Sequence, residues 1–227
     1  MRMQTARFLG AAKKAILVLK NYYESQLACT TAPSPAQPPN VEFPHPTHFL
    51  SLDNVTNHSF EYLSPLNEEK LVFYGTAGDD KICIKFVRRY SKDAHHTCSL
   101  LGFAPALRGF QSIPGGWSMV VMDFIDNTYH ELEDSYAKAS FETEIRTKVT
   151  SLHQAGYVHG DIRTTNIMVR KDGKPGILLV DFDWAGKIEE VRYPMNMNNV
   201  DIKRPEGASD DQLIKAEHDI AMIGYMF

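Results

Sequence analysis

The sequence predicts an α+β protein in which a series of antiparallel strands precedes an amphipathic helix and two polar turns. Residues 59–88 are rich in β-branched and aromatic residues between short polar turns, which is the pattern of antiparallel strands. Residues 136–156 instead repeat apolar side chains every three or four positions, as an amphipathic helix does. Two polar turns, 159–166 and 181–183, then flank the apolar run 177–180. The chain is organised around these turns.

The composition is that of an ordinary globular protein. The 227 residues are enough for one large domain or two small lobes. A net charge of −4 gives no basic footprint, so we do not expect nucleic acid as a partner. No apolar run is long enough to span a bilayer, so no membrane partner is expected either. Three scattered cysteines without a CxxC pair argue against disulfides and zinc, and indicate an intracellular protein, cytoplasmic or nuclear.

Residues 1–29 are expected to form a separate amphipathic helix. Residues 1–23 carry five basic residues and no acid, so a mitochondrial transit peptide is the alternative. Apolar residues recur at helical spacing, however, which favours a helix that docks on a core: Phe8, Ala12, Ile16, Leu19, Tyr23 and Leu27. Residues 30–58 are expected to form an arm or linker, because six prolines fall within 30–48.

Residues 59–125 are expected to form a small antiparallel sheet. Strands are predicted over 59–66, 71–77 and 81–87, separated by polar turns. The third of these strands contains Lys85 within the run Ile-Cys-Ile-Lys. A lysine in an otherwise apolar strand needs a charged partner or a route to solvent, so Lys85 is a candidate for a functional cation.

Three further elements complete the pattern. Residues 91–101 predict a short helix that ends at a glycine. A hairpin is predicted next, with strands at 108–113 and 117–125 around a Pro-Gly-Gly turn. The amphipathic helix predicted over 136–156 comes last and leads the chain into the first polar turn.

The two polar turns carry the side chains that suggest chemistry. The first turn places Asp161 and Asn166 five residues apart, and the second begins with Asp181 directly after an apolar strand. The strand between the turns brings their ends side by side, where a metal ion can bridge them. Carboxylate and amide oxygens suit Mg²⁺, which keeps few protein ligands and relies on substrate phosphates.

In order and spacing these turns resemble the catalytic and metal-binding loops of the protein-kinase-like superfamily, H-x-D-x-x-x-x-N followed by D-F-G. The resemblance implies a bilobal α+β fold, with a small antiparallel N-lobe over residues 59–125 and a shortened, mainly helical C-lobe over 126–227. It also implies ATP and Mg²⁺ as cofactors and a hydroxyl group as phosphoryl acceptor. The order of segments is most similar to divergent fungal kinase-like proteins, truncated at the C-terminus.

The same resemblance implies roles for individual residues. Asp161 is implied as the catalytic base and Arg163 as the basic residue that faces the transferred phosphate. Asn166 and Asp181 are implied as Mg²⁺ ligands, and Lys85, in a run similar to V-A-I-K, as the partner of the α- and β-phosphates. The contacts to the adenine ring are implied for a gatekeeper and hinge formed by Met122, Asp123, Phe124 and Ile125.

Two downstream segments also fit the resemblance. Arg204-Pro205-Glu206 is similar to the A-P-E that closes the activation segment, and residues 219–224 are similar to the D-x-x-x-x-G helix that anchors the catalytic loop. Because the chain ends just after this helix, the apolar face of residues 221–227 is expected to lie bare unless a partner covers it.

Four departures from the family pattern stand out. No Gly-rich loop is present, and residues 64–69 instead hold a proline and two acids. The short helix lacks the glutamate that fixes the lysine, and Asp93 and His95 are its nearest substitutes. Gly160 stands where the family has an arginine that answers a phosphorylated activation loop, so control by that route is not expected. Asp183 replaces the glycine of D-F-G.

Three functions remain open at this point. The first is an ATP- and Mg²⁺-dependent protein kinase-like phosphotransferase that acts on Ser or Thr hydroxyls, favoured by the R-P-E and D-x-x-x-x-G segments. The second is a small-molecule kinase similar to aminoglycoside or choline kinases, favoured by the H-G-D and D-F-D-W-A-G runs. The third is a pseudokinase or binding scaffold with weak or no ATP binding, favoured by the acidic loop, the missing glutamate and the early end.

Overall fold

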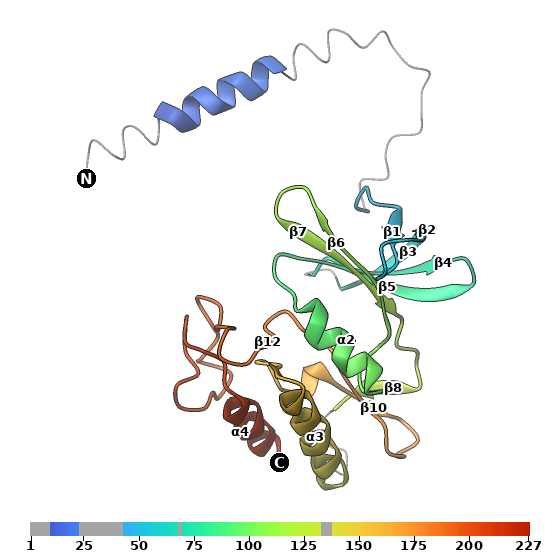
Figure 1. Ribbon diagram of the computed structural model, residues 1–227, viewed down its shortest axis with the longest axis vertical. Coiled ribbons are helices and arrows are strands. Elements are labelled where there is room, and N and C mark those ends of the chain that lie inside the picture. The colour runs from blue at the N-terminus through green and yellow to red at the C-terminus, as the bar shows by residue number, and fades with distance from the viewer. Residues whose placement is uncertain (1–9, 23–42, 68–69, 133–137) are drawn as a thin grey trace. The chain divides into compact units, whose positions relative to one another are not determined.

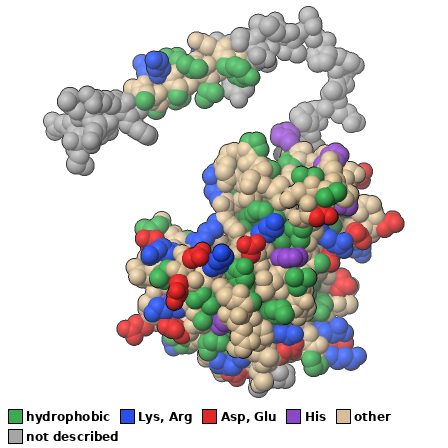
Figure 2. Space-filling view, in the orientation of Figure 1, with side chains coloured by type: hydrophobic (Ala, Val, Ile, Leu, Met, Phe, Trp, Pro, Cys, Tyr) green, Lys and Arg blue, Asp and Glu red, His purple; other side chains and the backbone are tan. Residues whose placement is uncertain are grey.

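The computed structural model of the protein describes residues 10–22, 43–67, 70–132 and 138–227, and divides the chain into two units at residue 44 (Figure 1). In the first unit residues 10–22 form a helix. Its apolar side chains lie on its surface (Figure 2), and the exposed fraction is 65% for Ile16 and 54% for Leu19. These values describe the helix by itself, and its docking on a core stays a prediction. Phe8, Tyr23 and Leu27 lie outside the described residues.

The second unit begins with two short strands that the sequence placed in a linker. Strands β1 (His48–Leu50) and β2 (Asn57–Ser59) pair with each other, and Ser51 bridges to Gly109. Gly109 allows this close approach, because a Cβ there would lie 2.6 Å from the ring of Phe49. The arm expected over residues 30–58 therefore gives way, from His48 onward, to paired strands.

A five-stranded antiparallel sheet follows, in the order β3-β4-β5-β7-β6. The small sheet that the sequence predicts is confirmed, with bounds close to the expected ones: β3 Glu61–Asn67, β4 Val72–Ala77, β5 Asp80–Val87, β6 Leu107–Ile113 and β7 Trp117–Asp123. Ile82 and Ile84 on the central strand β5 are fully buried. Lys85 also belongs to β5 and is paired with Val120 of β7. Its charged side chain therefore starts from the central strand of an apolar sheet.

Helix α2 (Lys92–Leu100) connects β5 to β6 and packs beside the C-terminal part of the unit (Figure 1). Ser91 caps its first turn by accepting a hydrogen bond from the Ala94 backbone N–H at 3.3 Å, as a serine does at this position. The face of α2 that is buried consists of Ala94, His95 and Cys98.

The rest of the unit combines two helices with short strands. Helix α3 (Lys138–Gln154) buries Ile145, Val149 and Leu152, and helix α4 (Ala216–Met226) packs against it. The remaining elements are β8 Tyr129–Glu131, β9 Tyr157–Val158, the 3₁₀ turn η1 Thr164–Asn166, β10 Ile167–Arg170, β11 Ile177–Leu179 and β12 Gly186–Lys187. None of the helices in the described part of the chain has the length and apolar character that a membrane span requires.

The apolar face predicted for residues 221–227 is divided between core and solvent. Met222 and Ile223 belong to the main hydrophobic core, where their exposed fractions are 5% and 0%. Tyr225 and Phe227 remain exposed at 43% and 40%. Helix α4 therefore contributes buried side chains to the core of this unit.

Candidate active site

The first polar turn, predicted to be the catalytic turn, is held in place by a buried carboxylate of α4. Asp219 is 1% exposed and accepts hydrogen bonds from the backbone N–H groups of His159 and Gly160, both at 2.8 Å. The ring of His153 lies 3.0 Å from the same carboxylate. The anchoring role predicted for the D-x-x-x-x-G helix is thus present. Gly160 has a φ of +81°, and a Cβ there would lie 2.8 Å from Ile214, which explains why no larger residue occupies this position.

The two polar turns lie side by side because β10 and β11 are antiparallel neighbours. Ile167 is paired with Leu179, so the residues just outside this pair, Asn166 and Val180, also meet. The backbone N–H of Val180 donates to the carbonyl of Asn166 at 3.0 Å. Asp181 follows directly, with a φ of +68° that non-glycine residues rarely adopt. Strained backbone of this kind clusters at functional sites.

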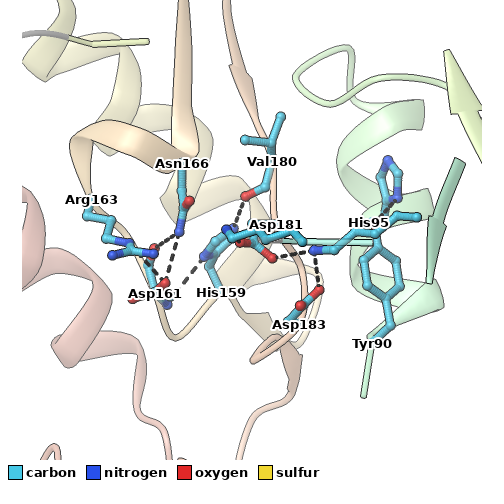
Figure 3. Close-up of polar contacts among 11 residues, drawn as sticks. Tyr90, His95, His159, Asp161, Arg163, Asn166, Val180, Asp181 and Asp183 are labelled. Atoms are coloured by element: carbon cyan, nitrogen blue, oxygen red, sulfur yellow. Dashed lines mark hydrogen bonds and ion pairs between the residues drawn. The ribbon is translucent and has the colours of Figure 1, made fainter. Parts of the chain in front are cut away.

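Both oxygens of the Asp161 carboxylate are engaged (Figure 3). The amide Nδ2 of Asn166 donates to Oδ2 at 2.9 Å, and Nε of Arg163 forms an ion pair with the same oxygen at 3.1 Å. Nη1 of Arg204 donates to Oδ1 at 3.0 Å. The Arg204 side chain is only 5% exposed and lies over the ring of Trp184, 4.9 Å from its centroid. Two guanidinium groups therefore compensate a carboxylate that is almost fully buried.

Lys85 lies between two carboxylates of the second polar turn. Its Nζ is 2.6 Å from Oδ1 of Asp181 and 2.6 Å from Oδ1 of Asp183. It also lies 5.7 Å from the centroid of the Tyr90 ring. The charged partner that the sequence requires for Lys85 is thus supplied by the second polar turn and not by the short helix.

The charges of this group depend on burial and on one another. Burial disfavours the Lys85 ammonium, but the Asp181 and Asp183 carboxylates outweigh it and raise the pKa of Lys85. Burial acts against ionisation of Asp181 as well, yet Lys85 holds the pKa of Asp181 below its usual range. Burial, opposed by Lys85 and assisted by the neighbouring Asp181 carboxylate, raises the pKa of Asp183 to about 6. Lys85 remains an ammonium group.

Neither residue suggested as a substitute for the helix glutamate contacts Lys85. Asp93 is exposed. His95 is fully buried, and its two ring nitrogens lie 2.7 Å from the Tyr90 hydroxyl and 2.9 Å from the Pro105 carbonyl. Burial lowers the pKa of His95 to about 4, so the ring is neutral near pH 7. His95 instead stacks on Phe182, with the ring centroids 4.7 Å apart and the planes at 6°.

A cavity of about 310 Å³ brings most of the predicted site residues together. This volume lies at the lower end of the range of small-molecule pockets, about 300–1,000 Å³. Its polar end is formed by Lys85, Asn166 and Asp181, and its apolar walls include Leu66, Val72 and Met168. The residues predicted as gatekeeper and hinge line it as well: Met122, Asp123, Phe124 and Ile125. Asp161 and Arg163 lie beside this cavity, connected to it through Asn166.

Four residues near the cavity were not assigned a role from the sequence. Lys70 comes from the β3–β4 connection and places its Nζ 3.5 Å from Oδ2 of Asp181, while Glu68 and Glu69 lie outside the described residues. Glu131 of β8 lines the cavity. Arg204 and Asp183 complete the set. The only signal for Asp183 was an acid at a glycine position, combined with a lysine that lacked a partner.

The donor set near Asp181 fits a magnesium ion that is held partly by phosphates. Asn166 and Asp181 present amide and carboxylate oxygens to one cavity. Within the described ranges no group of three or more His, Cys, Asp or Glu side chains is suited to hold a metal. A site with two protein ligands therefore needs the remaining ligands from substrate and water, which is how Mg²⁺ is usually bound.

The five-stranded sheet, the hinge, the anchored catalytic turn and the cavity next to it define a protein-kinase-like fold. Vaccinia related kinase 3 shares this fold, with a TM-score of 0.56 over 90% of this chain and 70% of that one, at 13% sequence identity. The kinase PK-1 of Cydia pomonella granulovirus aligns with a TM-score of 0.49 over 57% of this chain and 53% of that one, at 20% identity.

Sequence comparison finds partial matches. Citron Rho-interacting kinase of Mus musculus is 38% identical over 99 residues, and that of Rattus norvegicus is 37% identical over 97 residues. Each match covers 43% of this chain. The matched part is about 4% of the length of either relative. No protein-family model matches the sequence.

Proposed function

We propose that the protein is a phosphotransferase that moves the γ-phosphoryl group of ATP, with Mg²⁺, to a hydroxyl group on a Ser or Thr side chain of a protein. One observation carries the proposal. A single cavity is lined by a buried lysine, by two oxygen ligands suited to Mg²⁺ and by a strand-to-hinge segment, and the buried Asp161 lies next to it. Phosphoryl transfer requires little beyond this, because positioning and electrostatic stabilisation do most of the catalytic work.

Each part of the site has a separate task in this proposal. Asn166 and Asp181 would hold Mg²⁺. When bound, this ion would neutralise part of the phosphate charge. Lys85 and Lys70 add positive charge at the same end of the cavity. The apolar walls and the backbone of residues 123–125 provide the surface for the adenine ring.

Asp161 would orient the acceptor hydroxyl and accept its proton. Oδ2 is held by Asn166, which fixes the direction of the carboxylate. Oδ1 is occupied by Arg204, so an acceptor hydroxyl has to share this oxygen or displace the guanidinium group. Arg204 is therefore placed to affect how the acceptor approaches, whereas Lys85 and Asp181 act on the nucleotide.

Nucleotide binding is the first test. Millimolar Mg-ATP is expected to raise the unfolding temperature, because a ligand at a hundred times its Kd adds about 2.7 kcal/mol, or roughly 5–10 °C for a chain of this size. The shift is measured by thermal denaturation with Mg-ATP, with ATP and a chelator, and with Mg²⁺ alone. It is expected to be largest with both components and to be reduced in Asp181→Asn. The absence of any shift with Mg-ATP would contradict the proposal and favour a binding scaffold.

The acceptor is tested separately with ATP labelled on its γ-phosphate. The protein is incubated with a heat-treated cell extract, which is then separated into protein and small-molecule fractions. We expect label on Ser and Thr residues of the protein fraction, and none when Asp161→Asn replaces the natural protein. Label found only in the small-molecule fraction would identify a small-molecule kinase instead.

A further inference from the structure

Lys85 needs a carboxylate that does not also serve a metal ion. Its exposed fraction is 9%, and an ammonium group removed from water is stable only beside an opposite charge. Asp181 is one of its two partners, at 2.6 Å, but Asp181 is also the carboxylate that the proposed function assigns to Mg²⁺. A second carboxylate is required if Lys85 is to keep its position.

Helix α2 does not provide that carboxylate. Asp93 is the one acid in its sequence, and its side chain is exposed to solvent. His95, two residues on, is committed to the Tyr90 hydroxyl and the Pro105 carbonyl. Its ring lies parallel to that of Phe182, so α2 contributes packing to the second polar turn and no charge to Lys85.

Asp183 contacts Lys85 directly, and the backbone on which it lies is held by neighbouring elements. Its Oδ1 lies 2.6 Å from Nζ of Lys85, and its side chain is two-thirds buried, with an exposed fraction of 32%. The preceding Phe182 is fully buried against His95, and its carbonyl accepts a hydrogen bond from Ser91 N–H at 3.0 Å. The backbone that carries Asp183 is therefore held by α2, and Phe182 also contacts His159 of the first polar turn, with the ring centroids 5.2 Å apart.

We propose that Asp183 is the positioning residue for Lys85, replacing from the second polar turn the acid that α2 lacks. The proposal rests on the proposed function for the role of Lys85 toward phosphate, but the contact itself is a property of the protein alone. Asp181 is then available to the metal while Asp183 keeps the ammonium group directed at the cavity. This proposal links two departures from the family pattern. Asp183, which replaces a glycine, supplies the carboxylate that α2 lacks.

The test is a double-mutant cycle with Lys85→Met and Asp183→Asn, measured in two ways. Without nucleotide, the two substitutions together are expected to lower the unfolding temperature by clearly less than the sum of their separate effects. With Mg-ATP, Asp183→Asn is expected to weaken binding about tenfold when Lys85 is present and less than twofold in the Lys85→Met background, as residues in contact couple to this extent. Lys85→Gln takes the place of Lys85→Met if the latter does not fold.

The control is Asp172→Asn, which removes a carboxylate from an exposed ion pair with Arg170; neither residue lines the cavity. Its effects are expected to add to those of Lys85→Met in both measurements. Additive effects for Asp183→Asn would overturn the proposal, because Asp183 would then act independently of Lys85. If the natural protein binds no Mg-ATP, the proposed function fails. The unfolding cycle still tests whether Asp183 and Lys85 interact: coupled effects would support the interaction, and additive effects would refute it.

Discussion

Replacement of Asp161 by asparagine is expected to reduce phosphoryl transfer about a thousandfold, because a positioned general base contributes about 10²–10⁴-fold to a rate. Mg-ATP binding is expected to persist, since the nucleotide cavity is lined by Lys85, Asn166 and Asp181 and not by Asp161. Asparagine keeps the shape of the side chain and one acceptor oxygen, so Arg204 retains a partner at that position. The measurements are the transfer rate from labelled ATP and the unfolding temperature with and without Mg-ATP.

Asp172→Asn is the control for the Asp161 experiment as well. Asp172 belongs to an exposed ion pair, so its replacement is expected to leave both transfer and nucleotide binding unchanged. If Asp161→Asn lost the nucleotide-induced shift together with transfer, the role of Asp161 would be in nucleotide binding or in folding. Transfer at the natural rate in Asp161→Asn would exclude Asp161 as the base.

Asp219→Ala is expected to lower the free energy of unfolding by about 4 kcal/mol. The substitution leaves the backbone N–H groups of His159 and Gly160 buried without an acceptor, and each such loss costs about 1–3 kcal/mol. This is a large part of the stability of a typical domain, about 5–15 kcal/mol. Denaturant unfolding measures the change, and transfer should fall as well because the catalytic turn loses its support.

The structure offers a closely matched control for this prediction. Asp210 also accepts hydrogen bonds from two backbone N–H groups, those of Asn196 at 2.7 Å and Met197 at 3.0 Å, but near the surface. In Asp210→Ala water can replace the lost acceptor, so a much smaller loss of unfolding free energy is expected. Equal effects of the two substitutions would show that the burial of Asp219 is not what makes its hydrogen bonds important.

Much of the fold was accessible from local patterns. Apart from β8 (Tyr129–Glu131), which was not predicted, the strands and helices of residues 61–154 were predicted within a few residues of their bounds, because alternation and helical spacing indicate which side chains face a core. The first helix shows the limit of this reasoning. Its spacing predicts an apolar face that contains Ile16 and Leu19, but periodicity describes a face and does not indicate which surface covers it.

The sequence by itself determined the two polar turns and the order of segments around them, since these depend on residues close together in the chain. It identified Lys85, Asn166 and Asp181 as residues of one site, and their meeting follows from one antiparallel strand pair and the sheet beside it. It also indicated that Lys85 required a charged partner, without indicating which residue that partner was.

Only the tertiary structure decided how charge is distributed in the site. Arg204 meets Asp161 across 43 residues of chain, and Asp183 meets Lys85 across 98. No spacing rule covers such separations, because contacts of this kind depend on where whole elements pack. From the sequence, both Asp93 and His95 were candidate partners for Lys85. Because α2 packs against Phe182, His95 is a core residue and Asp93 is exposed to solvent.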